Sequence, residues 1–316
     1  MMATTCSRAF SRLCEALIVV ALCTAARAEP AATLFVSRQI TPAGEYTFGI
    51  EGPAADLDGN LYVVNFRKAG TIGRLARDAP GSEKFIDLPE GSIGNAIRFD
   101  RQGTMLIADY KGHTVFALAK GSTELKALFS SERFNQPNDI TVASHGTIYA
   151  SDPNWKARSG QIWRIVRGAD GTATGEVMTA ARVMGTTNGI DLSPDGRTLY
   201  VGESSTGQIW RYAIRGNELA DARLVTAFEP NTIDGIRTDR KGRLLVARIL
   251  KGAIDIVTAQ GRLERTITLH GKEPTNLAFG GPDGKSVYVT QRQGGYIEMF
   301  RTDQEGREHC VQTGAC

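Results

Sequence analysis

The sequence predicts an all-β, six-bladed β-propeller with four antiparallel strands per blade, and three observations support this prediction. One phrase occurs six times: a polar residue, a short apolar run, a turn with glycine, and a second apolar run. The copies begin 42 to 50 residues apart, which is the spacing of propeller blades. The turn glycine always lies eight residues after the opening residue, here called the opener. The openers are Glu51, Asn95, Asn138, Asn188, Asp234 and Asn276, and the glycines are Gly59, Gly103, Gly146, Gly196, Gly242 and Gly284.

Each copy also predicts the strands of its blade. Two strands flank the turn glycine, and a third follows a loop, as in the alternating stretches after Gly160 and Gly207. An outer strand is expected before most openers, at 83–87, 125–129, 224–228 and 263–269, and its pattern is weaker before Asn188. The extended stretch 33–37 is expected to join the last blade and close the ring. Sustained helical periodicity is not found after residue 28, so we expect no helix in the domain.

The first 28 residues are typical of a signal peptide. Arg8 and Arg12 form a basic start, residues 16–22 form an apolar run, and residues 26–28 (ARA) match an A-x-A cleavage site. The apolar run is too short to span a bilayer. The sequence therefore predicts export to the periplasm or to the medium. It divides into a signal peptide at 1–28, a propeller at 29–309 and a tail at 310–316.

The charge and the cysteines fit an exported small-molecule protein. The chain carries a net charge of +3, and loss of the three Arg and one Glu in residues 1–28 leaves +1. Since basic residues form no block, we expect neither nucleic-acid binding nor membrane binding after cleavage. Only Cys310 and Cys316 lie outside the predicted signal peptide. In an oxidising compartment they are expected to form a disulfide, and two free thiols are the alternative.

The six openers are the candidate functional residues. The innermost strand of each blade lines the central channel, so its opener should lie near one end of that channel. Glu51 and Asp234 offer two carboxylates, and Asn138 and Asn188 offer amide oxygens. Such a set suits a hard divalent cation, Ca²⁺ first, with Mg²⁺ or Mn²⁺ possible, and lacks the His and Cys typical of zinc. The alternative is that these side chains only bind their own backbone at strand starts.

Several motifs resemble those of the regucalcin and gluconolactonase family over most of the chain after residue 28. They are Glu51-Gly-Pro, Pro137-Asn138-Asp139, Asn188-Gly189, Asp234-Gly235 and the FGGPDG that follows Asn276. The resemblance implies a six-bladed propeller with an axial divalent cation, usually Ca²⁺, held by Glu51, Asn138, Asn188 and Asp234. Asn95 and Asn276 would line the channel, and Asp139 would lie beside the ligands. The sequence departs from the sugar-lactone members at Gln136, where these tend to carry Arg.

The resemblance implies a hydrolase that opens a small lactone or related ester with water. The cation would polarise the carbonyl, and Asp234 would be the general base or the nucleophile. Trp155 and Arg248 lie in loops near the channel and are candidates for the substrate wall. Two alternatives remain: a non-enzymatic propeller that keeps calcium as a structural ion, and an isomerase or lyase that uses the metal to stabilise an enolate.

Overall fold

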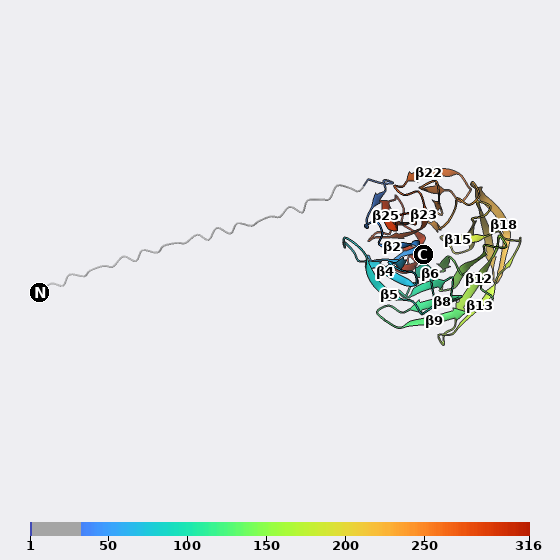
Figure 1. Cartoon of the computed structure of the whole chain (residues 1–316), viewed down its shortest axis with the longest axis horizontal. Coiled ribbons are helices and arrows are strands. Elements are labelled where there is room, and N and C mark those ends of the chain that lie inside the picture. Colours follow the sequence, from blue (N-terminus) through green and yellow to red (C-terminus); the bar gives the residue numbers. More distant parts are fainter. Residues whose placement is uncertain (2–32) are drawn as a thin grey trace. The chain divides into compact units, whose positions relative to one another are not determined.

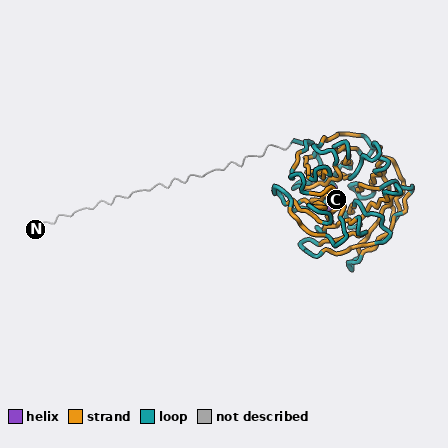
Figure 2. The backbone as a smooth tube through the Cα atoms, viewed as in Figure 1, coloured by secondary structure: helices purple, strands orange, loops and turns teal. Residues whose placement is uncertain are grey.

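The computed structural model describes Met1 and residues 33–316, so the predicted signal peptide lies almost wholly outside the described residues. In residues 33–316, six small sheets surround a central axis (Figure 1). The strands form the ring and loops connect them (Figure 2). The predicted all-β, six-bladed propeller is confirmed.

Each blade runs outward from an innermost strand at the axis. The first three blades are β2 (Tyr46–Ala55), β3 (Leu61–Phe66), β4 (Thr71–Leu75) and β5 (Glu83–Asp87); β6 (Gly94–Phe99), β7 (Met105–Asp109), β8 (Thr114–Leu118) and β9 (Leu125–Ser130); and β10 (Ile140–Val142), β11 (Ile148–Asn154), β12 (Ser159–Arg167) and β13 (Ala173–Val177). The last three are β15 (Thr187–Leu192), β16 (Thr198–Glu203), β17 (Gln208–Arg215) and β18 (Glu218–Ala227); β19 (Ile236–Thr238), β20 (Leu244–Arg248), β21 (Ala253–Val257) and β22 (Leu263–Thr268); and β23 (Pro274–Gly280), β24 (Ser286–Gln291), β25 (Tyr296–Arg301) and β1 (Arg38–Gln39).

The N-terminal segment closes the ring, but not with the residues that the sequence predicted. Strand β1 (Arg38–Gln39) pairs antiparallel with β25, and so it supplies the outer strand of the sixth blade. The predicted strand at 33–37 makes only one bridge, from Leu34 to Arg301. Phe35 has a φ of 64°, in the left-handed region, and this interrupts the extended backbone there.

Two further elements depart from the prediction. The fourth blade has a fifth strand, β14 (Thr179–Ala180), which runs parallel to β18. A short helix, α1 (Arg307–Thr313), follows the last blade, although the sequence predicted none. Seven residues are too few to show a helical period, and a helix this short depends on tertiary contacts for its stability. No helix in residues 33–316 is long and apolar enough to cross a membrane.

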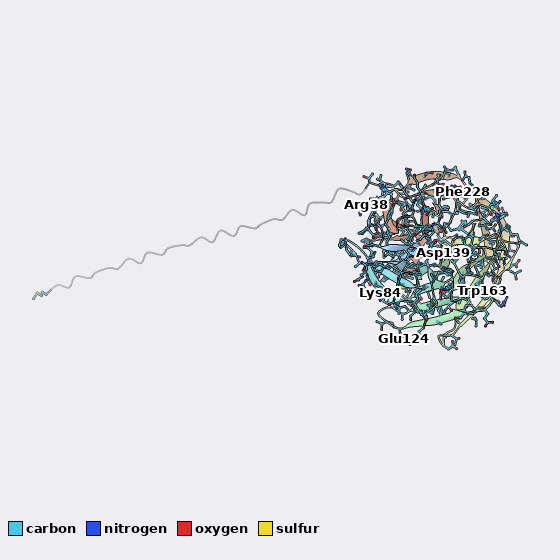
Figure 3. The ribbon with its side chains drawn as sticks, viewed as in Figure 1. Arg38, Lys84, Glu124, Asp139, Trp163 and Phe228 are labelled. Carbon is cyan, nitrogen blue, oxygen red and sulfur yellow. A yellow bond between two sulfur atoms is a disulfide. The ribbon has the colours of Figure 1, made fainter. Side chains whose placement is uncertain are left out.

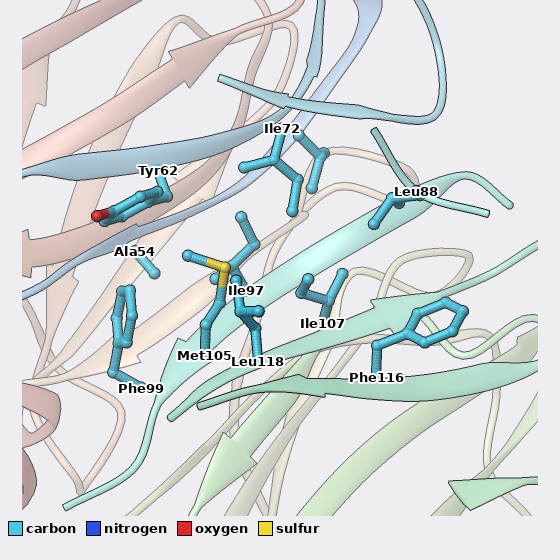
Figure 4. Packing of buried hydrophobic residues seen from close by; sticks show 11 residues of the cluster. Ala54, Tyr62, Ile72, Leu88, Ile97, Phe99, Met105, Ile107, Phe116 and Leu118 are labelled. Carbon is cyan, nitrogen blue, oxygen red and sulfur yellow. The ribbon is translucent and has the colours of Figure 1, made fainter. Parts of the chain in front are cut away.

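Apolar side chains between neighbouring blades form the core, and strand alternation distributes them. Met105 and Ile107 of β7 pack toward the first blade with Tyr62 (Figure 4). Leu106 and Ala108 of the same strand pack toward the third blade with Trp163. Every residue of β7 is therefore buried, because both faces of the strand meet a neighbouring blade.

Near the axis the innermost strands approach one another too closely for side chains. A Cβ on Gly52 would lie 2.4 Å from the carbonyl oxygen of Asn95, and one on Gly189 would lie 2.5 Å from that of Asp234. Both glycines directly follow an opener. At these two positions the absence of a side chain lets the neighbouring inner strands come together at the axis.

We expect Gly52→Ala to lower the free energy of unfolding by more than left-handed backbone strain alone would. Gly216 is a matched control, because its φ of 59° resembles the 52° of Gly52 but an added Cβ meets nothing within 4 Å. Gly216→Ala should cost about 1 kcal/mol of unfolding free energy from left-handed strain. Gly52→Ala should cost about 1–3 kcal/mol more from overpacking. Urea denaturation of both variants measures this, and equal losses would show that the inner strands are not held at this spacing.

Candidate functional site

The six openers lie at one end of the ring, which we call the mouth. All six innermost strands start at this end, and the loops between the second and third strands of each blade are at the same end. Asn138 and Asp234 stand just before β10 and β19. Their backbone N–H groups donate to the carbonyl oxygens of Ser151, at 2.8 Å, and Ala247, at 3.1 Å. The second strand of each blade thus fixes the opener of the first.

Glu51 and Asp234 place two carboxylates together at the mouth. Burial raises the pKa of Glu51 to about 8, although a hydrogen bond from the backbone of Gly52 opposes the rise. Burial also raises the pKa of Asp234 well above its ordinary value, and the charge of Glu51 raises it further. Contact with Asn188 offsets part of this shift. The two groups resist carrying negative charge together without a cation.

Two asparagines leave amide oxygens available at the same place. Asn138 Oδ1 is buried and accepts no hydrogen bond from any residue that the structure describes. Asn188 Nδ2 donates to Ser204 Oγ at 3.0 Å, and that hydroxyl donates to the Ile233 carbonyl oxygen at 2.8 Å. The amide nitrogen of Asn188 is therefore held on the Ser204 side, which leaves its oxygen on the opposite edge. A buried acceptor without a donor is costly, and a metal ion would satisfy it.

The other two asparagine openers are occupied differently. Asn276 Oδ1 accepts from Arg237 Nη2 at 2.8 Å and from the backbone N–H of Leu277 at 2.9 Å. Asn95 Nδ2 donates to the carbonyl oxygen of Asn138 at 3.3 Å. Asn276 thus uses its oxygen within the protein, and Asn95 supports a neighbouring opener.

Asp139 lies near the middle of the ring (Figure 3) and is fully buried. Its Oδ1 accepts from Arg98 Nη2 at 2.7 Å, and its Oδ2 accepts from Arg237 Nη1 at 2.9 Å. Burial raises the pKa of Asp139 to about 6, and the charge of Arg98 opposes that rise. The structure therefore places Asp139 between two guanidinium groups, directly beside Asn138 in the chain.

The ionisable groups along the channel carry a net negative charge when all of them are ionised. Away from the mouth lies an axial ion cluster of three cations and three anions: Arg98, Arg237, Arg307, Asp139, Asp191 and Glu308. When all six are ionised, their charges sum to zero. Glu51 and Asp234 then leave two negative charges at the mouth, which is the charge that one divalent cation neutralises.

The donor set fits a hard cation and not a thiolate or imidazole site. Within residues 33–316, no group of three or more His, Cys, Asp or Glu side chains is placed to hold a metal. A metal at the mouth would therefore depend on asparagine oxygens together with the two carboxylates. All-oxygen sets of this kind suit Ca²⁺, Mg²⁺ or Mn²⁺.

Comparison with known proteins places this arrangement in a family. Residues 50–293 match the family described as SMP-30/Gluconolactonase/LRE-like region. The chain belongs to this family. It is 26% identical to diisopropyl-fluorophosphatase of Loligo vulgaris over 84% of this chain and 92% of the relative. It is 27% identical to a pentonolactonase of Haloferax volcanii over 77% of this chain and 81% of the relative. The calcium-binding protein regucalcin of Agrobacterium tumefaciens superposes with a TM-score of 0.67 at 21% identity, covering 84% of this chain and 96% of that one.

The two predicted wall residues of this SMP-30/gluconolactonase-like protein have different surroundings. Trp155 lies in the loop between β11 and β12 at the mouth, and it is 47% exposed. Arg248 is buried, with its guanidinium bonded to Asp255 at 2.6 Å and Glu229 at 2.7 Å and stacked on Phe228 at 3.8 Å. Since protein groups occupy the Arg248 side chain, we leave it out of the proposed substrate wall.

Two groups of residues near the axis are not among those that the sequence predicted. Phe48, three residues before Glu51, is 67% exposed at the mouth, and the Arg292 guanidinium lies 4.6 Å from its ring. Arg98 and Arg237 each lie three residues after an opener, where Thr141 and Asp191 also stand in their repeats. Polar residues that recur at this position of a buried strand could have indicated side chains that face the axis. Simple alternation from the opener does not place them there. A β-bulge at the opener adds one residue to the strand, and this turns the third position after the opener toward the axis.

We expect Glu51→Gln to stabilise the metal-free protein. The amide has nearly the same shape and stays neutral, whereas the raised pKa of Glu51 costs the folded state stability at every pH above the ordinary pKa of glutamate. The melting temperature in chelator at pH 8 should therefore rise by about 2 °C or more. Glu298→Gln is the matched control, because Glu298 is buried among donors: Ser37 Oγ, the N–H groups of His270 and Gly271, and Gln291 Nε2. That control should lower the melting temperature. A loss of stability in both variants would mean that Glu51 carries no uncompensated charge.

Proposed function

We propose that this protein is a metal-dependent hydrolase that opens a lactone or a related ester with water at an axial divalent cation, most readily Ca²⁺. One observation carries the proposal: two carboxylates that form no salt bridge with any described residue share the mouth with the unpartnered oxygen of Asn138. The relatives support the reaction class, since two of them are named as a pentonolactonase and a fluorophosphatase. The signal-peptide pattern of residues 1–28 supports export to the periplasm or the medium.

The side chains divide the work of such a reaction. Glu51, Asn138, Asn188 and Asp234 would hold the cation. The bound cation would polarise the carbonyl oxygen of the substrate and stabilise the charge that develops on it. Asp234 is half-buried at the mouth, and its carboxylate would take a proton from water or attack the carbonyl. Asn276 and Asp139 hold their neighbours in position through the hydrogen bonds described above.

The rim of the mouth favours a substrate with an apolar part. Phe48, Trp155 and Leu250 are exposed there, from the first, third and fifth blades. At the opposite end, the turn between β2 and β3 exposes Leu57. Apolar side chains gathered around a polar site are typical of small-molecule pockets, in which a few polar groups set the orientation. With Gln136 in place of the arginine of sugar-lactone enzymes, we infer that aliphatic or aryl lactones are better substrates than sugar lactones.

The first experiment is a lactonase assay of the purified mature protein on aliphatic, aryl and sugar lactones, with Ca²⁺ and with chelator. Turnover should require metal, and Asp234→Ala should reduce kcat by about 100-fold or more. Asp58→Ala is the control, because Asp58 is an exposed carboxylate paired with Lys120 at the opposite end. Absence of turnover together with a Ca²⁺-induced rise in melting temperature would contradict the enzyme and favour a binding propeller with a structural ion.

A second measurement tests the apolar rim. Trp155→Ala and Leu250→Ala should raise KM for long-chain lactones by about 10-fold each, with a smaller effect on short-chain ones. Leu224→Ala is the control, since Leu224 is similarly exposed but lies on the outer strand β18. If KM does not depend on chain length in the wild type, the rim does not bind the substrate.

A further inference from the structure

Helix α1 lies at the end of the channel away from the mouth and touches all six blades. The C-terminus lies over the centre of the ring (Figure 1). The contacts run in blade order as follows: Gln312 Nε2 to the Ala55 carbonyl oxygen at 3.0 Å, Glu308 Oε2 to Arg98 Nε at 3.9 Å, Arg307 Nη2 to the Val142 carbonyl oxygen at 2.6 Å, Arg307 Nη1 to Asp191 Oδ1 at 3.3 Å, Glu308 Oε2 to Arg237 Nε at 3.9 Å, and the Phe279 N–H to Glu308 Oε1.

Glu308 is the member of this helix that reaches toward the mouth. Its Oε2 lies between Arg98 and Arg237, at 3.9 Å from each. These two guanidinium groups bond Asp139 on their other side. The guanidinium groups of Arg98 and Arg237 thus both contact Asp139 on the mouth side and Glu308 on the side of α1.

The network continues from the two arginines to the proposed metal ligands. Arg98 and Arg237 fix Asp139, whose neighbour in the chain is Asn138. Arg237 also donates to Asn276 Oδ1, which turns the Asn276 amide nitrogen toward Asp139 and Glu51. Loss of Glu308 would leave two close guanidinium groups with one carboxylate between them, and their repulsion would act directly on Asp139.

The helix is itself anchored. Cys310 of α1 is buried and bonded to Cys316, and Gly314 ends the helix in a left-handed conformation. Arg307 is buried against the third and fourth blades. The position of Glu308 is therefore set at both ends of the helix.

We propose that α1 is a positioning element of the mouth: through Arg98 and Arg237, Glu308 holds Asp139 and Asn276 so that Asn138 and Glu51 are arranged for a divalent cation. The inference rests on the proposed metal site. In this arrangement helix α1, which lies outside the repeats, sets the affinity of that site for the cation. Residues that hold metal ligands in place typically change metal affinity by 10- to 100-fold when they are lost.

The test is a calorimetric Ca²⁺ titration of Glu308→Gln beside Glu305→Gln in the full mature chain. Glu305 is the matched control, because it pairs with Arg240 and also contacts α1 through His309 Nδ1 at 3.1 Å, but has no salt bridge to the arginines of the axial ion cluster. Glu308→Gln should weaken Ca²⁺ binding by about 10-fold or more, and the Ca²⁺-induced rise in melting temperature should shrink accordingly. Glu305→Gln should bind as the wild type does. Equal affinity of all three proteins overturns the inference.

If Glu308→Gln does not fold, a second variant tests the positioning role of α1. Cys310→Ser with Cys316→Ser keeps the ion cluster but releases the anchor of α1, so Ca²⁺ affinity should fall by about 3-fold or more. Wild-type affinity in this double variant would then contradict the positioning role. If the wild type itself binds no Ca²⁺, the proposed metal site fails instead, so the two failures are distinguished.

Discussion

The distribution of buried charge along the channel is the constraint on which the rest of this propeller depends. Three arginines and three acids balance one another in the axial ion cluster, and the two carboxylates at the mouth have no salt-bridge partner among the described residues. Burial of this many ionised groups is tolerated only where each finds an opposite charge and hydrogen bonds. Glu51 and Asp234 violate that rule in the metal-free chain. Such a violation is expected at a functional site, where stability is given up for chemistry.

The architecture concentrates these groups because of how blades converge. Each innermost strand contributes its opener at the mouth, and four of the six add a second polar residue deeper in the channel: Arg98, Thr141, Asp191 and Arg237. Gly52, Gly189 and Gly235, which directly follow openers, permit a close approach between neighbouring inner strands. Helix α1 then closes the far end, so that the mouth is the face at which the proposed substrate would enter. A cavity of about 500 Å³ between the first two blades, lined by Tyr62, Phe99 and Gln312, is separate from the openers.

The repeat made much of this predictable. The six copies predicted the blade number, the second strand of each blade and the ring of polar openers, because each copy obeys the same local pattern of turn and alternation. Family membership followed from the same motifs. The N-terminal strand was expected in the right blade but a few residues early, since no pattern signals the left-handed Phe35. Helix α1 was missed because seven residues outside the repeat carry no period.

The sequence by itself determined the fold and placed the six openers at one end of the ring, because both depend on local pattern and on counting repeats. The tertiary structure decided which of those residues have free oxygens. Asn138 and Asn276 are identical openers in sequence, yet one oxygen is unpartnered and the other is bonded to Arg237. Asp234 and Gly235 both oppose Ala247, and after this irregular strand start Arg237 bonds Asp139 at the axis, whereas Arg248 is bonded to Asp255. Such pairings depend on contacts between blades, and no single repeat encodes them.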